Sequence, residues 1–150
     1  MSTGNETLSN ADFERLRVLV YEESGIHLSA DKKTMMEIRL KRAYDDPAED
    51  DGYRVLIDRL WPRGVSRERA RLDEWAKELA PSAELRRWFG HEPARFAEFR
   101  ARYEAELGEQ GAKLDELRGR ARQGTLTLVY GARDTEHNDA VVLADVLRRG

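Results

Sequence analysis

Two short apolar segments constrain the fold of this chain more than any other feature of its sequence. Residues 53–58 are mostly apolar and lie between Gly52 and the turn-forming residues Pro62 and Gly64, and residues 125–130 are rich in β-branched and aromatic side chains. Short apolar runs bounded by turn residues are typical of buried strands. The sequence therefore predicts a strand at each position, and the helical region between them allows the two strands to be parallel.

Residues 36–44 allow two interpretations. They can continue a helix that starts earlier in the chain, or they can form a strand, because apolar and charged side chains alternate from Ile38 to Lys41. Alternation with a period of two is typical of a half-buried strand. We favour the strand, and the helix is the alternative.

Helical periodicity accounts for most of the remaining residues after position 58. Helices are predicted at about residues 66–79, 81–90, 93–107, 114–124 and 138–149. The aromatic residues with helical spacing are predicted to lie in the core: Trp75, Trp88, Phe96, Phe99 and Tyr103. The predicted fold class is therefore α/β, with a small, mostly parallel sheet flanked by helices.

The composition excludes several kinds of function. The chain has 150 residues and no cysteine, which excludes disulfides and sites built on thiolates. Its formal net charge is −3, which argues against nucleic acid as a partner. No apolar run approaches the roughly 20 residues that span a bilayer, and no motif for a metal or a redox cofactor is present. We therefore expect a cytoplasmic protein with no cofactor, no metal and no membrane contact.

The first 35 residues are predicted to form a helical appendage. Phe13, Leu16 and Val20 lie on one face of a helix that ends near Gly25. A segment of this size is too small to fold by itself. Its apolar face is therefore expected to pack on the rest of the chain, on a protein partner or on a second copy of the chain.

The loop that follows residues 53–58 is rich in arginine. Residues 54–71 contain six arginines and only two acidic residues, although the whole chain is acidic. The planar guanidinium matches phosphate and carboxylate groups, so Arg59 and Arg63 are candidates for binding an anion. Asp58, at the end of the predicted strand, is a candidate general base. The alternative is that these residues only form ion pairs with one another.

The loop that follows residues 125–130 contains a second group of polar residues. Asp134 could orient His137 for proton transfer, so both are candidate catalytic residues. Tyr130 and Asn138 are candidate ligand-binding residues, although Asn138 is also well suited to cap a helix. Ligands of parallel sheets bind beyond the carboxyl ends of the strands. The two loops are therefore expected to meet at one edge of the sheet.

Residues 36–150 resemble the YeaO-like family, a bacterial group of unknown function. The resemblance is carried above all by Asp-Arg-Leu-Trp-Pro-Arg-Gly at residues 58–64, and further by residues 41–44, 51–57, 75–82, 85–89, 99–103 and 125–130. The family typically has alanine at the position of Gly131. It implies an α/β fold and no established activity. Its polar residues add Arg54, Lys77 and Arg86 to the candidates for ligand binding.

Residues 11–35 resemble the start of the N-terminal helical domain of CheR, the chemotaxis receptor methyltransferase. The resemblance is carried by Phe13, Leu16, Val20 and the run Gly25-Ile26-His27-Leu28. The cofactor-binding domain of that enzyme is absent, so methylation is not implied. The predicted organisation is a helical appendage at residues 1–35 followed by a YeaO-like α/β domain at residues 36–150.

These observations predict a protein that binds or hydrolyses a phosphorylated or otherwise anionic small molecule through its arginine-rich loop. The alternative is a non-enzymatic protein-interaction module that uses the N-terminal helices. A homo-oligomer formed through Phe13, Leu16 and Val20 is also open.

Overall fold

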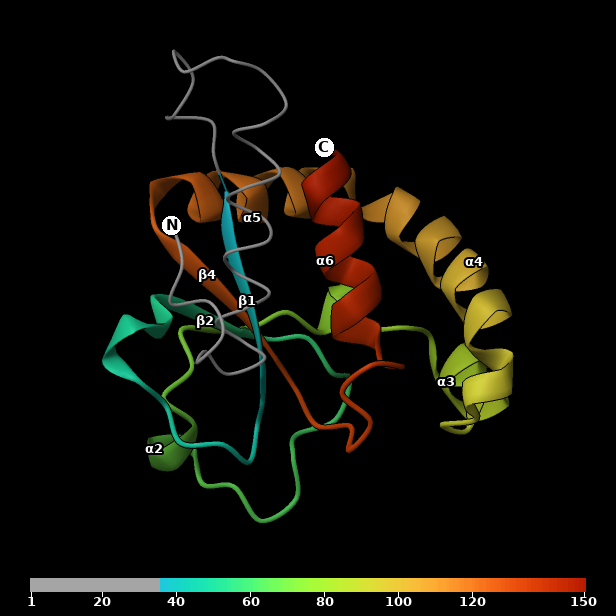
Figure 1. The fold of residues 1–150 in the computed structure, drawn as a ribbon, viewed down its shortest axis with the longest axis horizontal. Coiled ribbons are helices and arrows are strands. Elements are labelled where there is room, and N and C mark those ends of the chain that lie inside the picture. Colours follow the sequence, from blue (N-terminus) through green and yellow to red (C-terminus); the bar gives the residue numbers. More distant parts are fainter. Residues whose placement is uncertain (1–35) are drawn as a thin grey trace, which may run out of the picture.

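The computed structural model describes residues 36–150, which form an α/β fold around a parallel sheet (Figure 1). The strands are β1 (Glu37–Arg42), β2 (Tyr53–Leu56), β3 (Glu74–Trp75) and β4 (Thr125–Tyr130). They are arranged in the order β1-β4-β2-β3, and every neighbouring pair is parallel. This arrangement confirms the predicted fold class and the strand at residues 36–44. The predicted appendage at residues 1–35 lies outside the described residues.

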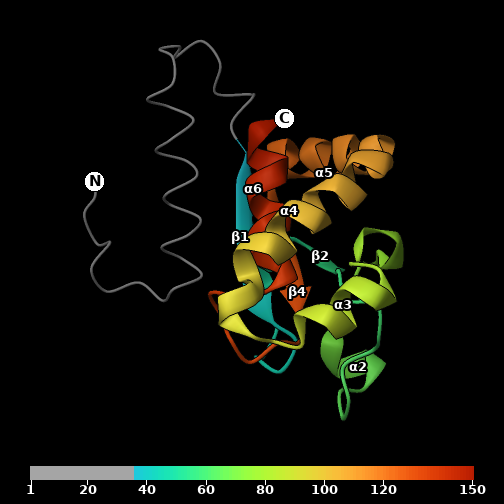
Figure 2. The ribbon, with the colours of Figure 1, turned by 90° about the vertical axis from the view of Figure 1, so that its right-hand side faces the viewer.

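Helices cover one face of this sheet, except for the short α2 (Arg67–Ala70), which lies on the opposite face beside the Arg54 side chain. The others are α3 (Ala83–Phe89), α4 (Phe96–Leu107), α5 (Gly111–Gln123) and α6 (Asp139–Arg149), with short 3₁₀ turns at Glu49–Asp51, Lys77–Leu79, Pro93–Arg95 and Gly108–Gln110. Both α5 and α6 contact β1 and β4, and α4 packs on α6. Figures 1 and 2 show α4, α5 and α6 together on this side of the sheet.

Local sequence signals define the ends of two helices that flank the site described below. The Ser82 hydroxyl accepts a hydrogen bond from the Leu85 N–H (3.1 Å) at the start of α3, and Gly90 ends this helix in a left-handed conformation. The Asn138 side chain accepts a hydrogen bond from the Val141 N–H (3.0 Å) at the start of α6. The Asn138 cap stands where the sequence predicts it, and α3 lies within the helix predicted at about residues 81–90.

The strands alternate between two chemically different faces. One row of side chains packs against the helices in the main core, which includes Ile38, Val55, Leu126 and Leu128. The opposite face has a smaller apolar cluster around Leu56 and Val129, against which Trp61 and Trp75 pack. Both faces are therefore covered, as is usual for a parallel sheet.

The opposite face also contains a buried charge cluster, which consists of Arg39, Lys41, Asp51 and Arg54. The Asp51 carboxylate accepts hydrogen bonds from Arg39 (2.9 Å), Arg54 (2.6 Å) and Lys41 (3.2 Å). Arg39 and Arg54 both lie beside Thr127 of β4, so they form one row across the sheet. The Arg54 side chain also donates to the Ala70 carbonyl (2.8 Å). The Thr127 hydroxyl of β4 also donates to the Asp51 carbonyl (2.6 Å), so this cluster joins β1, β2 and β4 to the segments that follow β1 and β2.

The prediction of a single helix at residues 66–79 is wrong. α2 ends after one turn because Arg71 adopts a left-handed conformation (φ 49°), and residues 74–75 form the edge strand β3 instead. The Asp73 and Ala76 N–H groups donate to the Arg54 and Leu56 carbonyls, at 2.8 Å each. Pairing with β2 therefore satisfies backbone groups that a continued helix would have bonded internally.

The predicted aromatic core is confirmed only in part. Phe99 and Tyr103 are buried, whereas Trp75, Trp88 and Phe96 are half-buried. Trp88 lies at the surface of α3, where the guanidinium groups of Arg95 and Arg102 stand over its ring at 5.4 and 4.5 Å. Helical spacing identified the inward face of α4, but it did not show how much of each ring the neighbouring elements cover.

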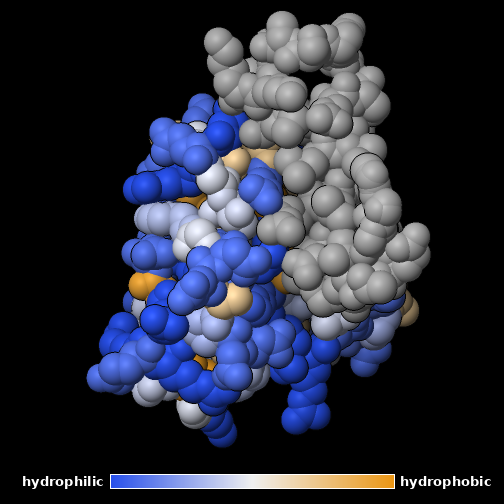
Figure 3. All heavy atoms as spheres, turned by 60° about the vertical axis from the view of Figure 1, so that its left-hand side comes forward, coloured by the Kyte–Doolittle hydropathy of each residue, from blue (hydrophilic) through white to orange (hydrophobic). Residues whose placement is uncertain are grey.

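The described surface in Figure 3 is mostly hydrophilic, in keeping with a chain of which 37% of the residues are charged. Among residues 36–150, every helix is too short or too polar to cross a lipid bilayer.

Candidate functional site

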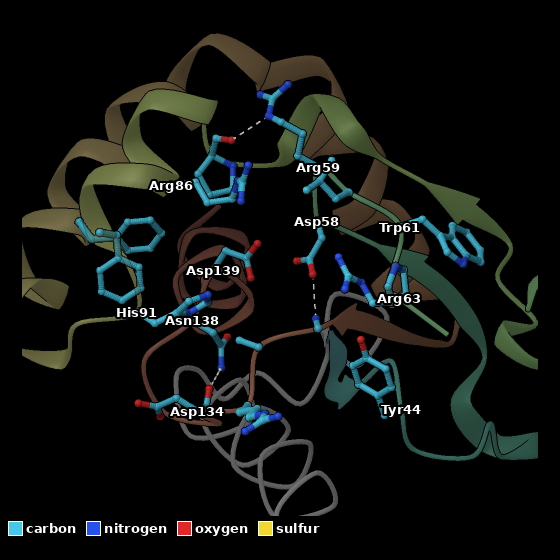
Figure 4. Close-up of a pocket in the computed structure, with 18 residues that line it drawn as sticks. Tyr44, Asp58, Arg59, Trp61, Arg63, Arg86, His91, Asp134, Asn138 and Asp139 are labelled. Atoms are coloured by element: carbon cyan, nitrogen blue, oxygen red, sulfur yellow. Dashed lines mark hydrogen bonds between the residues drawn. The ribbon is translucent and has the colours of Figure 1, made fainter. Parts of the chain in front are cut away.

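A pocket opens at the edge of the sheet where β2 and β4 end. Its volume is about 570 Å³, which lies in the range of small-molecule sites, roughly 300–1,000 Å³. The loops that follow β2 and β4 supply most of its lining, and α3, α4 and the start of α6 supply the rest (Figure 4). The lining residues are Tyr44, residues 58–63, Pro81, Arg86, Phe89, His91, Phe99, residues 131–134, Asn138 and Asp139.

Two tryptophans hold the loop that follows β2 in place. The Trp61 indole donates to the Val65 carbonyl (2.6 Å) and closes the turn around Arg63. The Trp75 indole donates to the Asp58 carbonyl (2.8 Å), and the two tryptophan rings meet edge to face with centroids 5.3 Å apart. The Asp-Arg-Leu-Trp-Pro-Arg-Gly segment is thus anchored to β3, with Asp58, Arg59 and Arg63 at the pocket.

Four arginines line the pocket: Arg59, Arg63, Arg86 and Arg133. All four are exposed, and none forms a salt bridge with another residue of the described part of the chain. The Arg59 Nε donates to the Pro81 carbonyl (3.3 Å). By contrast, Arg39 and Arg54 on the opposite face of the sheet share the buried Asp51. The pocket arginines therefore have guanidinium groups available for an anion.

Two carboxyl groups face each other inside the pocket (Figure 4). Asp58 follows β2, Asp139 begins α6, and their side chains are hydrogen-bonded to each other. Asp58 Oδ2 also accepts a hydrogen bond from the Gly131 N–H (2.8 Å). We refer to Asp58 and Asp139 as the carboxyl pair. It joins the ends of β2 and β4 to the start of α6.

Both members of the carboxyl pair have raised pKa values. Burial raises the pKa of Asp139 well above its usual value, and the neighbouring Asp58 charge raises it further. Burial also raises the pKa of Asp58, although the hydrogen bond from Asp139, the Gly131 N–H and the Arg86 charge all lower it. Asp139 is therefore the proton donor of the pair and Asp58 the acceptor.

An aromatic wall closes the side of the pocket formed by α3 and α4. The Phe89 and Phe99 rings are stacked with centroids 4.4 Å apart, and both are buried. The consecutive left-handed residues Gly90 and His91 (φ 54° and 59°) turn the chain after α3, which places His91 at the pocket. The pocket thus combines an apolar wall, a cationic rim and a carboxyl pair.

Six of the predicted site residues line this pocket, as expected if both loops leave parallel strands at one edge: Asp58, Arg59, Arg63, Arg86, Asp134 and Asn138. Asp134 is partly occupied elsewhere, because it accepts hydrogen bonds from the Glu136 N–H (2.9 Å) and from the His137 N–H (3.1 Å). These bonds, together with the His137 ring, lower the pKa of Asp134. Asn138 caps α6, so its side-chain oxygen is used in the fold.

The structure places the other four predicted residues outside the pocket lining. His137 pairs with Asp134 through Nδ1 (2.8 Å) and packs its ring on Phe96. Tyr130 is buried, and its burial raises its pKa to about 12. Arg54 belongs to the Asp51 charge cluster on the opposite face of the sheet, and the Lys77 ammonium stands over the Trp75 ring at 4.1 Å.

Sequence reasoning missed Asp139, His91 and the phenylalanines of the aromatic wall as site residues. Asp139 follows the helix cap Asn138, so it resembled an acidic residue that interacts with the helix dipole. A carboxyl group at the end of the second loop, complementing Asp58 at the start of the first, was the available signal. Among residues 36–150, no group of three or more acidic or histidine side chains could hold a metal ion.

Comparisons with known proteins identify relatives of unknown function. Residues 37–150 match the family described as "Inactive DUF488-N3 subclade", and residues 11–45 match the "CheR methyltransferase, all-alpha domain". The chain is 48% identical over 113 residues to the "Uncharacterized protein YeaO" of Escherichia coli K12, covering 75% of this chain and 98% of that protein. It is 44% identical over 110 residues to the "Uncharacterized protein Rv3073c" of Mycobacterium tuberculosis H37Rv, covering 73% of this chain and 92% of that protein. No solved structure shows a significant match. Both resemblances noted from the sequence are thereby confirmed.

Proposed function

The chain belongs to the inactive DUF488-N3 subclade, and we propose that it is a binding protein for a phosphorylated or similarly anionic small molecule. The observation that carries this proposal is the set of pocket arginines without salt bridges within residues 36–150, namely Arg59, Arg63, Arg86 and Arg133. These four arginines outnumber the three carboxyl residues of the lining, Asp58, Asp134 and Asp139. The pocket is therefore cationic although the whole chain is acidic, and a small anion is the ligand that this charge favours.

Binding without turnover is supported by two further observations. The family that residues 37–150 match is described as an inactive subclade. In addition, His137, the candidate proton shuttle, is directed to Asp134 and Phe96, and it does not line the pocket.

Hydrolysis of the same ligand is a second candidate function, favoured by the carboxyl pair. Asp139 can donate a proton while Asp58 accepts one, which is the division of roles that general acid–base catalysis requires. The remaining alternative, an interaction module, rests on residues 1–35 and so lies outside the described residues.

Calorimetric titration of the full chain with inorganic phosphate and pyrophosphate tests the binding function. Adjacent arginines on α3 provide a matched pair of variants, because Arg86 lines the pocket and Arg87 is exposed outside it. We expect Arg86→Ala to weaken binding by about tenfold or more, since a hydrogen bond to a charged group contributes roughly 1.5–3 kcal/mol. Arg87→Ala should bind as the unmodified chain does.

A variant at the centre of the loop separates a guanidinium clamp from simple charge attraction. We expect Arg63→Lys to bind about as weakly as Arg63→Ala, because lysine cannot form the bidentate contact. No binding of phosphate, pyrophosphate or any phosphate ester by the unmodified chain would contradict the proposed function. Release of phosphate from an ester, lost in Asp58→Asn, would establish hydrolysis instead.

A further inference from the structure

The pocket arginines explain why an anion would enter, but they do not explain why carboxyl groups lie among them. Figure 4 shows Asp58 and Asp139 at the centre of the pocket, with Arg63 and Arg86 on different sides of them. A ligand that presented only anionic groups would be repelled by the Asp58 carboxylate. It would also displace water from this group without replacing the lost hydrogen bonds, which costs free energy. The site therefore favours a ligand with a second kind of polar group.

The Asp58 carboxylate has acceptor capacity that the protein leaves unused. Its Oδ2 accepts from the Gly131 N–H, and Asp139 supplies one further donor. An ionised carboxylate offers about four lone-pair sites on its two oxygens. Asp58 also remains in contact with the pocket, because it is half-buried and belongs to the lining. A bound ligand can therefore donate hydrogen bonds to Asp58.

We infer that the ligand is a phosphorylated polyol, such as a sugar phosphate, whose phosphate binds the pocket arginines while its hydroxyl groups donate to Asp58. This inference rests on the proposed function. As donors to Asp58, hydroxyl groups fit better than an ammonium group, because the surrounding arginines would repel the positive charge of an ammonium group. The aromatic wall of Phe89 and Phe99 offers an apolar surface for the C–H groups of such a ligand. Asp139, by donating to Asp58, holds the accepting carboxylate in position.

Two probes isolate the contribution of the hydroxyl groups. Ribitol 5-phosphate and n-pentyl phosphate share a phosphate ester and a linear five-carbon chain, and they differ in the hydroxyl groups along it. Calorimetric titration of the full chain should show ribitol 5-phosphate binding at least about tenfold more tightly, since hydrogen bonds to a charged group are worth roughly 1.5–3 kcal/mol. This comparison uses the unmodified chain and needs no variant to fold.

Variants then assign the preference to Asp58. We expect Asp58→Asn to reduce the ratio of the two affinities to less than about threefold, because the accepting charge is lost. Asp115→Asn is the matched control, because Asp115 is an exposed acid on α5 whose side chain is 77% accessible. Thermal melts of each variant identify any that do not fold.

The outcomes distinguish this inference from the function on which it rests. Equal affinity for both probes, or tighter binding of pentyl phosphate, would overturn the polyol inference and leave anion binding intact. A preference for ribitol 5-phosphate that survives in a folded Asp58→Asn variant would overturn the role of Asp58. Failure of both probes and of inorganic phosphate to bind would overturn the proposed function itself.

Discussion

Single acidic residues on the two faces of the sheet have opposite electrostatic environments. Burial alone would raise the pKa of Asp51, but the Ala48 N–H, Lys41 and Arg54 stabilise its carboxylate, so its pKa is lowered. The Asp51 carboxylate therefore stabilises the fold at pH values above the pKa that Asp51 has in the unfolded chain. This stabilisation is lost as the pH falls through the lowered pKa of Asp51 in the folded chain. The charge of Asp51 thus stabilises the fold, whereas the pKa values of the carboxyl pair are shifted in the opposite direction.

The carboxyl pair lowers the stability of the fold as the pH rises. The pKa of Asp139 is raised in the folded chain, so between the ordinary value of 3.8 and the raised value the folded state binds more protons than the unfolded state. Stability falls with increasing pH in that window. The raised pKa of Asp139 thus lowers the stability of the fold as the pH rises, and such shifted pKa values are common at binding and catalytic sites.

Asp139→Asn should therefore stabilise the chain at neutral pH and not below pH 4. The amide can donate to Asp58 as the protonated acid does, and it has no proton to lose. Melting temperatures measured from pH 4 to pH 8 should show a difference from the unmodified chain that grows with pH. A difference that is constant over this range, or that grows as the pH falls, would show that Asp139 is ionised in the folded chain.

At the scale of secondary-structure elements, the start of β2 depends on the absence of a side chain at Gly52. This residue has a left-handed φ of 67°, and a Cβ atom placed there would lie 2.2 Å from the Thr125 carbonyl oxygen at the start of β4. The close approach lets Tyr53 pair with β4 at the correct register. Both the conformation and the contact therefore favour glycine.

Gly52→Ala should destabilise the chain by about 3 kcal/mol or more, because backbone strain and overpacking both contribute. Gly119→Ala is a matched control. It lies within α5 with no atom within 4 Å of its added Cβ, so it should stabilise the chain by roughly 0.5–1 kcal/mol through helix propensity. Urea denaturation measures both effects. A cost below about 1 kcal/mol for Gly52→Ala would show that β2 and β4 can separate at this point without penalty.

For the whole molecule, the main question is whether residues 36–150 fold without the first 35. The E. coli relative supports this, because the match covers 98% of that protein but only 75% of this chain. Residues 36–150 also form a four-stranded sheet in the order β1-β4-β2-β3 and the helices that cover it. The domain boundary at residue 36 remains a prediction, since the two family matches overlap at residues 37–45.

Deletion of residues 1–35 should leave a chain that melts cooperatively and binds phosphate with unchanged affinity. The physical reason is that residues 36–150 form a packed core and line the pocket. Calorimetry measures the melt and the affinity, and light scattering of both chains measures the molar mass. A lower molar mass after deletion would show that the apolar face of Phe13, Leu16 and Val20 joins subunits. Aggregation or a non-cooperative melt would place the appendage within the core.

The sequence by itself determined the features that depend on neighbouring residues. Alternation and apolar runs predicted β1, β2 and β4, and the cap at Asn138 marked the start of α6. Because parallel strands end at a common edge, the same patterns also brought Asp58, Arg63 and Asp134 to one pocket. These signals are local, so they can be read before any tertiary contact is known.

Only the tertiary structure decided how residues that are distant in the chain are paired. Arg59 and Arg54 belong to the same arginine-rich segment, yet one lines the pocket and the other is held by Asp51, because Arg59 lies in the loop beyond the carboxyl end of β2 whereas Arg54 lies within the strand. Asp139 became part of the site only when α6 placed it against Asp58. Residues 74–75 form a strand because they pair with the backbone of β2. Local sequence patterns do not identify such partners, because each pairing depends on how the complete chain packs.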